Sequence, residues 1–174
     1  MILEEYIKEE MIREKVKQLG KMITNHYPKG TTLTIICVLK GSLLFAADLM
    51  REINLDTNLE FLDLSSYSGS VRGDLVLNKE IDFSIADKNV LIIEDIVDSG
   101  NTINFIINEI KKKNPKSVKV ASLFFKKDAY NFDMKIDWIG FNIKNEFIVG
   151  YGLDYNQIYR NKKSIYIIKN EQEK

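Results

Sequence analysis

The sequence predicts an α/β fold in which helices flank a mostly parallel central sheet. Short apolar runs of the kind that form buried strands occur at 33–39, 90–93 and 118–125. Helical patterns at 43–51 and 103–110 alternate with these runs. Strands that alternate with helices at this spacing are typical of a parallel sheet with helices on its faces. Because ligands bind beyond the carboxyl ends of such strands, we expect the functional residues there.

The first expected element is an amphipathic helix at the start of the chain. Its apolar residues recur at spacings of mostly three or four, which is the period of one helix face; they are Leu3, Ile7, Met11, Val16, Leu19 and Ile23. Pro28 and Gly30 end this pattern. The strand at 33–39 and the helix at 43–51 come next.

The middle of the chain predicts a strand at 59–64 followed by a long hairpin. The segment 65–74, SSYSGSVRGD, is polar, contains glycine and has too little apolar content to pack. We expect it to be a mobile loop, with 75–81 as the returning arm of the hairpin.

The remaining elements follow the strand at 90–93, which the turn at 86–89 precedes. Ile103, Ile106, Ile107 and Ile110 mark one face of a helix. Three lysines at 111–113 close this helix, where a cation complements the helix dipole, and Pro115 stops it. Further strands are expected at 118–125, 138–143, 147–149 and 165–168.

Composition limits the classes of function. The chain has 174 residues, with 25 basic and 25 acidic side chains, so we expect one domain over 1–174 without a global field for nucleic acid. No apolar run approaches the roughly 18 residues of a membrane helix, and the acidic start MILEEYIKEE is unlike a signal peptide. The single cysteine, Cys37, lies in an apolar run, which favours a reducing compartment and a cytoplasmic protein.

Histidine is as scarce as cysteine. With His26 and Cys37 alone, a zinc site is nearly excluded, and a catalytic triad would have to use His26. We expect His26 to be a surface residue at a helix end. Carboxylates, lysines, a bound metal and backbone amides are then left to carry any chemistry.

The segment 90–102, VLIIEDIVDSGNT, carries the strongest chemical signal. Glu94 and Asp95 stand at the end of a buried strand, where they need a cation or hydroxyl groups as partners. The glycine-containing loop after them opens a helix, whose N–H groups and dipole favour a phosphate, and Ser99 and Thr102 add hydroxyl donors. The alternative from spacing alone is a generic acidic turn in which Asp98 and Ser99 cap the helix.

This segment resembles the phosphoribosyl pyrophosphate signature of type I phosphoribosyltransferases, in particular the hypoxanthine-guanine branch. Further similar motifs follow in the same order: LKGS at 39–42, SSY at 65–67, FFKK at 124–127, DWIGF at 137–141 and FIVGYGLDYNQIYR at 147–160. The resemblance covers nearly the whole chain from residue 33. It implies the type I fold, with a mostly parallel sheet, a small hood and a mobile hairpin loop.

The resemblance also implies roles at the sugar and phosphate. Glu94 and Asp95 would hold the ribose hydroxyls and help to organise Mg²⁺. The loop residues Asp98, Ser99, Gly100, Asn101 and Thr102 would wrap the 5′-phosphate, and Asp98 would be the general acid/base at purine N7.

The pyrophosphate end is implied in the same way. Lys40-Gly41 is similar to a pyrophosphate-binding dipeptide that has an unusual cis bond in the family, and Arg160 would contact pyrophosphate. Asp154 would be a second Mg²⁺-linked carboxylate at the purine side of the site. Without the resemblance, Lys40 reads as a solvated lysine and Arg160 as a surface residue.

For the base, Lys126 would donate to the purine O6, Phe147 would stack on the ring and the Ile148 backbone would meet the base edge. Without the resemblance, an aromatic residue before Ile-Val is more often core. Ser66 and Tyr67 would belong to the loop that closes over the site and excludes water.

The implied ligands are phosphoribosyl pyrophosphate, hypoxanthine, guanine, pyrophosphate and the nucleotides IMP and GMP, with Mg²⁺ as the cofactor. Asn101, where many relatives carry lysine, favours hypoxanthine. We expect neither a nucleic acid nor a membrane partner, but a homodimer or homotetramer with contacts such as Tyr6 or Tyr27. Two alternatives stay open: an enzyme of the same fold acting on xanthine or uracil, and a non-catalytic sensor of phosphoribosyl pyrophosphate that binds nucleic acid.

Overall fold

The computed structural model describes residues 2–66, 75–78 and 83–169. Its elements are β1 (Ile2–Ile7), α1 (Glu9–His26), β2 (Thr32–Leu39), α2 (Leu43–Glu52), β3 (Asp56–Ser66), β4 (Leu75–Leu77), β5 (Asn89–Val97), α3 (Asn101–Lys111), β6 (Ser117–Phe125), the 3₁₀ turn η1 (Lys127–Ala129), β7 (Trp138–Asn142), β8 (Ile148–Val149) and β9 (Ile165–Lys169).

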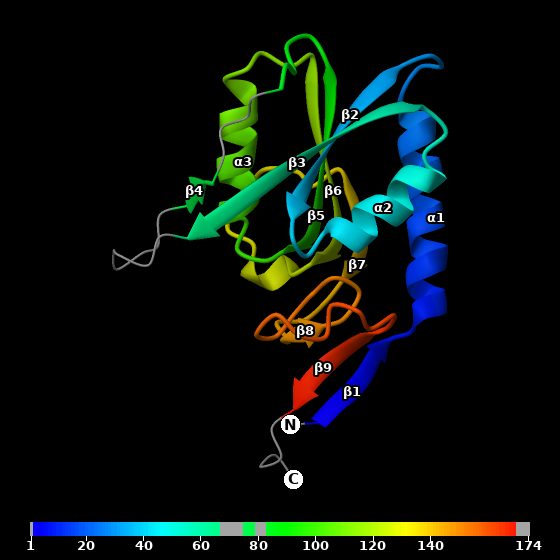
Figure 1. The fold of residues 1–174 in the computed structure, drawn as a ribbon, viewed down its shortest axis with the longest axis vertical. Helices are drawn as coiled ribbons and strands as arrows, with labels where there is room; N and C mark the ends of the chain where they lie inside the picture. Colours follow the sequence, from blue (N-terminus) through cyan, green and yellow to red (C-terminus); the bar gives the residue numbers. More distant parts are fainter. Residues whose placement is uncertain (1, 67–74, 79–82, 170–174) are drawn as a thin grey trace.

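The predicted parallel sheet is confirmed. Strands β3, β2, β5, β6 and β7 are parallel neighbours in that order, and β4 pairs antiparallel with the end of β3 as the returning arm of the hairpin. A second, antiparallel sheet of β1, β9 and β8 forms the hood. Figure 1 shows this hood below the main sheet, on the side toward which the parallel strands point. The carboxyl ends of the strands therefore face the hood, and this is the edge of the sheet where the functional residues are expected.

Each face of the main sheet has its own apolar core. One core joins α1 and α2 to the sheet through residues such as Ile12, Phe45 and Leu91. The other joins α3 through its four isoleucines, which are the residues that the periodicity placed on one helix face. Because apolar side chains cover both faces, the central strands β2 and β5 are apolar without alternation.

The beginning of the chain differs from the prediction. The helix begins at Glu9, and residues 2–7 instead form β1, which pairs with β9 at the other end of the chain. Met11, expected on the buried face, is exposed, and Ile12 is buried in its place. The periodicity of Leu3 and Ile7 fits a helix locally, but pairing with β9 places both residues in a strand.

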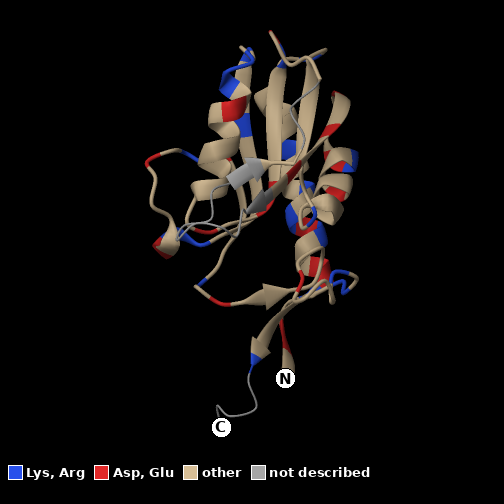
Figure 2. Cartoon of the chain, turned by 60° about the vertical axis from the view of Figure 1, so that its left-hand side comes forward, with Lys and Arg blue, Asp and Glu red and all other residues tan. Residues whose placement is uncertain are grey.

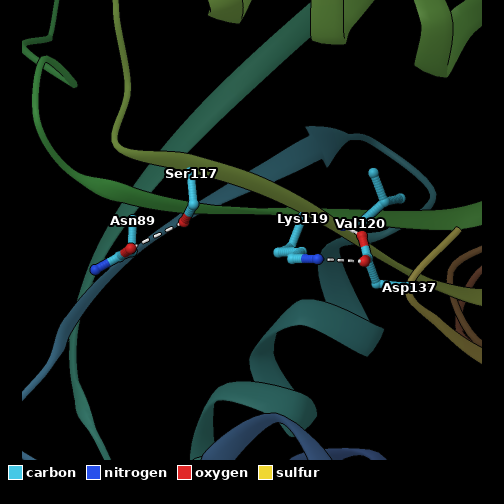
Figure 3. A network of polar contacts seen from close by, with 5 residues as sticks. All are labelled: Asn89, Ser117, Lys119, Val120 and Asp137. Atoms are coloured by element: carbon cyan, nitrogen blue, oxygen red, sulfur yellow. Dashed lines mark hydrogen bonds and ion pairs between the residues drawn. The ribbon is translucent and has the colours of Figure 1, made fainter. Parts of the chain in front are cut away.

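The amino ends of the later strands are joined by polar contacts (Figure 3). The Ser117 hydroxyl donates to Asn89 Oδ1 at 2.8 Å, between β6 and β5. Asp137, at the start of the DWIGF motif, accepts from Lys119 Nζ at 2.8 Å and from the Val120 N–H at 2.9 Å. These contacts lie at the amino ends of the parallel strands, away from the hood. We therefore infer that Asp137 has a structural role and links the start of β7 to β6.

Basic and acidic residues are interspersed along the helices and loops (Figure 2). His26 is exposed at the end of α1, as expected, with its ring edge-on to Tyr27 and Trp138. Cys37 is buried and has no disulfide. Among the described residues no helix is long and apolar enough to cross a membrane.

Candidate active site

The acid pair lies within β5 and not after it. The strand was expected to end at residue 93, but its ladder with β6 continues through Glu94, opposite Ser122, to Val97, opposite Phe125. Polar side chains at the carboxyl end of a strand do not stop backbone pairing when a neighbouring strand extends as far. The acids are therefore held by a rigid strand.

Glu94 is a buried carboxylic acid whose Oε2 has no hydrogen-bond partner within the described structure. Its Oε1 accepts only a long hydrogen bond, 3.3 Å, from the Asp95 N–H. Burial, followed by the nearby charge of Asp95, raises the pKa of Glu94 well above its ordinary value. A buried carboxylic acid without a partner can accept a hydrogen bond from a hydroxyl donor or bind a cation.

Replacing Glu94 by glutamine is expected to raise the melting temperature of the ligand-free protein by about 2–8 °C at pH 8. Because folding raises the pKa of Glu94, the wild-type protein is most stable below the ordinary pKa of glutamate. Its stability falls as the pH rises toward the pKa that Glu94 has in the folded protein. Glutamine does not titrate, so the gain is expected to shrink at pH 5. Thermal unfolding at both pH values measures it.

The exposed Glu14, replaced by glutamine, is the control and should change little at either pH. A Glu94→Gln protein that melts below wild type at pH 8 would show that the carboxylate stabilises the empty site.

A glycine in the loop after β5 allows two aromatic rings to pack closely against it. Gly100 has φ +89°, and a side chain there would come within 2.5 Å of Tyr130 and 2.7 Å of Phe132, which pack against it. It precedes α3, and the Ser99 hydroxyl accepts a long hydrogen bond, 3.5 Å, from the N–H of Asn101, the first residue of that helix. Of the capping alternative, the contact between Ser99 and the start of the helix is therefore present, whereas the Asp98 carboxylate bonds to Lys126 instead.

A small pocket of about 80 Å³ opens beside this loop. It is lined by Glu94, Ile96, Val97, Asp98, Ser99, Gly100, Thr102 and Ile103. The pocket thus joins a buried acid to a helix N-terminus, where N–H groups and the dipole favour an anion.

Asp98 faces a buried lysine. Lys126 Nζ donates to Asp98 Oδ2 at 3.1 Å and to Asn145 Oδ1 at 3.3 Å. Lys126 is buried and contacts Asp98, whereas its neighbour Lys127 is exposed. Asn145 carried no signal in the sequence and is found only through this contact.

An exposed aromatic ring lies on the same side. Phe147 exposes 55% of its surface, with its ring edge-on to Tyr155 at 5.8 Å, so the core alternative for Phe147 is wrong. Ile148 is buried in β8, opposite Ile167 of β9. A ring this exposed, two residues after the Asn145 that binds the buried Lys126, is suited to stacking on a planar ligand.

Three segments meet at two glycines. A side chain at Gly41 would overlap the Asp95 carboxylate, with a separation of 1.6 Å from Oδ2. A side chain at Gly152 would lie 2.1 Å from the Gly41 carbonyl oxygen. The cis peptide bond lies between Leu39 and Lys40, one bond before the Lys40-Gly41 dipeptide. Close packing brings the dipeptide against the acid pair.

Arg160 reaches this junction from the loop after β8. Its guanidinium donates to the Gly152 carbonyl at 2.8 Å and pairs with Asp154 at 2.6 Å. Both Asp154 oxygens are engaged, because Oδ2 accepts from the Gln157 N–H at 2.8 Å. The Asp154 carboxylate is thus fully engaged by Arg160 and the Gln157 N–H. Among the described residues, no group of three or more metal-binding side chains lies together.

The expected closing loop is only partly described. The backbone of Ser66 ends β3, opposite Leu75 of β4, which places the start of that loop at the hairpin. Tyr67 lies outside the described residues.

The structure thus combines an acid pair near a strand end, a small pocket at a helix N-terminus, a buried lysine and an exposed aromatic ring. The matching family model is described as a phosphoribosyl transferase domain and covers residues 5–156. The chain belongs to this family.

Similar proteins narrow the family to its hypoxanthine-guanine branch. The chain is 40% identical over 165 residues to the hypoxanthine-guanine phosphoribosyltransferase of Bacillus subtilis, covering 94% of this chain and 91% of that one. A crystal structure of a hypoxanthine-guanine phosphoribosyltransferase from Bacillus anthracis matches with a TM-score of 0.92 and 39% identity, over 97% of this chain and 100% of that one.

Two further matches are a longer curated protein and a second solved structure. The chain is 39% identical over 167 residues to the bifunctional protein TilS/HprT of Listeria monocytogenes. The matched region covers 95% of this chain but only 26% of that protein. A hypoxanthine phosphoribosyltransferase structure from Staphylococcus aureus matches with a TM-score of 0.89 and 35% identity, over 95% and 91% of the two chains.

Proposed function

We propose that the chain transfers the phosphoribosyl group of phosphoribosyl pyrophosphate to N9 of hypoxanthine and guanine, giving IMP or GMP and pyrophosphate. The observation that carries this proposal is the buried, unpartnered Glu94 beside the loop that opens α3. Relatives of about 40% identity named for this activity support it. The reaction is a salvage step that reuses free purine bases.

Glu94 and Asp95 would accept hydrogen bonds from the two ribose hydroxyls. The loop of Asp98, Ser99, Gly100, Asn101 and Thr102 would bind the 5′-phosphate through N–H groups and hydroxyls. Both ends of the sugar phosphate would then be held by neighbouring parts of one strand–loop–helix segment, which fixes the position of C1′.

Lys126 would donate to the purine O6, which favours 6-oxopurines over adenine, whose amino group opposes a cationic donor. Phe147 would stack on the base, and the Ile148 backbone would meet its edge. Asp98 would hold the proton on the imidazole side of the purine while N9 attacks C1′. Its contact with Lys126 supports one shared base-binding face.

Pyrophosphate leaves from the face opposite the base, so the sugar carbon is inverted. The Lys40-Gly41 backbone and Arg160 would bind the departing group. Their meeting at Gly152 supports a common role, because the guanidinium and the dipeptide both contact that residue.

The donor set fits Mg²⁺. This ion prefers oxygen ligands and keeps one or two carboxylates together with water and substrate phosphates, and Glu94 has a free buried oxygen. Mg²⁺ would offset charge on the pyrophosphate. Glu94 and Asp95 would be its protein ligands, directly or through the ribose hydroxyls. Asp154 would act through Arg160 as the residues are arranged here, and would have to release Arg160 to take part as a ligand.

Ser66 and Tyr67 would belong to the segment that covers the site during the reaction. Excluding water protects a transition state that resembles an oxocarbenium ion from hydrolysis.

The direct test is nucleotide formation from phosphoribosyl pyrophosphate with hypoxanthine, guanine, xanthine, adenine and uracil, each with and without Mg²⁺. We expect Mg²⁺-dependent IMP and GMP, with hypoxanthine used better because of Asn101. Product from xanthine or uracil alone would favour the first alternative. Binding of phosphoribosyl pyrophosphate without product from any base would favour the sensor.

We also propose a cytoplasmic homodimer or homotetramer. Tyr27 packs against the core and does not suit a contact between copies, while Tyr6 is exposed. Leu59 and Phe61, on the face of β3 that adjoins the α2 core, expose 38% and 50% of their surfaces and are better candidates. Light scattering tests self-association, and a monomer would contradict it.

A further inference from the structure

A hydrogen bond joins two segments that are far apart in the sequence. The Tyr151 hydroxyl donates to Asp48 Oδ2 at 2.6 Å, and the other oxygen of Asp48 contacts Arg51. Tyr151 comes from the loop after β8, and Asp48 from α2. Both line a pocket of about 380 Å³ between α1, α2 and residues 161–163. Burial, together with the hydrogen bond to Asp48, raises the pKa of Tyr151, so its hydroxyl stays a proton donor at neutral pH.

On one side, this bond holds the helix that continues the pyrophosphate dipeptide. α2 begins at Leu43, three residues after Lys40. The buried Ser42 hydroxyl donates to the Val38 carbonyl at 2.5 Å, and the Ala46 N–H donates to the Ser42 carbonyl at 2.8 Å. The dipeptide and α2 are thus bonded into one unit, so a displacement of α2 would displace Lys40.

On the other side, the bond holds the loop that carries Arg160. The Tyr151 N–H donates to the Lys162 carbonyl at 2.8 Å, and the Gly152 N–H donates to the Arg160 carbonyl at 3.0 Å. The Arg160 guanidinium returns to the Gly152 carbonyl at 2.8 Å. Tyr151 is therefore adjacent to the residue that binds Arg160 twice and that packs on the Gly41 carbonyl.

We propose that Tyr151 and Asp48 are positioning residues for the pyrophosphate end of the site. Their hydrogen bond sets the separation between α2, with Lys40-Gly41, and the loop that carries Arg160. The inference rests on the proposed pyrophosphate roles of Lys40, Gly41 and Arg160. Neither positioning residue needs to touch the substrate.

Tyr151→Phe keeps the ring in the core and removes only the hydrogen bond. We expect the KM for phosphoribosyl pyrophosphate to rise about ten-fold, equal to about 1.4 kcal/mol, with the KM for hypoxanthine changed less than two-fold. The dissociation constant of Mg²⁺-pyrophosphate, measured by calorimetry, should rise by the same factor. Asp48→Ala should weaken pyrophosphate binding by the same factor as Tyr151→Phe. Asp48→Asn keeps an acceptor oxygen and should recover most of the pyrophosphate affinity.

The double variant Tyr151→Phe/Asp48→Ala should bind pyrophosphate no worse than Asp48→Ala alone, because both substitutions remove the same Tyr151–Asp48 hydrogen bond. Tyr27→Phe, at the opposite end of the sheet, is the matched control and should bind pyrophosphate as wild type does.

Three outcomes would overturn the inference. Unchanged pyrophosphate affinity in Tyr151→Phe, with weakened binding in Arg160→Gln, would overturn the positioning role alone. If Tyr151→Phe raised the KM for phosphoribosyl pyrophosphate and the KM for hypoxanthine by similar factors and also lowered the melting temperature, the role of the bond would be merely structural. If pyrophosphate affinity were unchanged in Tyr151→Phe, Arg160→Gln and Lys40→Gly alike, both the proposed pyrophosphate site and the positioning role would be overturned.

Discussion

Replacing Asp98 by asparagine is expected to lower kcat for IMP formation about 100- to 10,000-fold. The amide keeps the size of the side chain but cannot exchange a proton with the purine. Lys126 keeps its second acceptor, Asn145, and so remains in place. We therefore expect the dissociation constant of phosphoribosyl pyrophosphate to change little, and the loss to fall on the chemical step in a pre-steady-state assay.

The control for this variant is Asp128→Asn, on the exposed turn that follows Lys126. It removes a nearby charge without touching the site and should leave kcat within two-fold. If Asp98→Asn loses no more than three-fold, the proton is held elsewhere, and Asp98 only orients Lys126.

Replacing Gly152 by alanine is expected to lower kcat/KM for phosphoribosyl pyrophosphate about 100-fold. Two effects add at this position. Gly152 has φ +99°, which side chains rarely adopt, and the new Cβ would lie 2.1 Å from the Gly41 carbonyl oxygen. Because that oxygen is part of the backbone, either the dipeptide or the loop has to move. A displacement of about 1 Å in groups that bind a substrate costs about 100-fold in rate.

Gly30→Ala separates the two effects. Gly30 also has a positive φ, +80°, but a side chain there would meet nothing within 4 Å. This variant should lose about 1–2 kcal/mol of stability and keep full activity per folded molecule. If Gly152→Ala behaves like Gly30→Ala in both thermal unfolding and kinetics, the contact with Gly41 does not hold the pyrophosphate end together.

Local patterns predicted most of the fold. The apolar runs of β2, β5 and β6 and the isoleucine face of α3 are predicted correctly. A strand that is covered on both faces is a short continuous apolar run, and a helix that is covered on one face shows the helical period. The error at β1 has a physical cause as well. Residues 2–7 become a strand through pairing with residues 165–169, and no local pattern contains a partner more than 150 residues away.

The sequence by itself determined the fold class, the position of the acid pair and of the glycine-containing loop before α3, and, through its motifs, the family. These depend on residues that are close together along the chain. Only the tertiary structure decided that Asp154 pairs with Arg160, that Asn145 shares Lys126 with Asp98, and that Tyr151 is bonded to Asp48. Such contacts arise when packing brings strand ends and loops to one edge of the sheet, and they have no fixed spacing in the sequence.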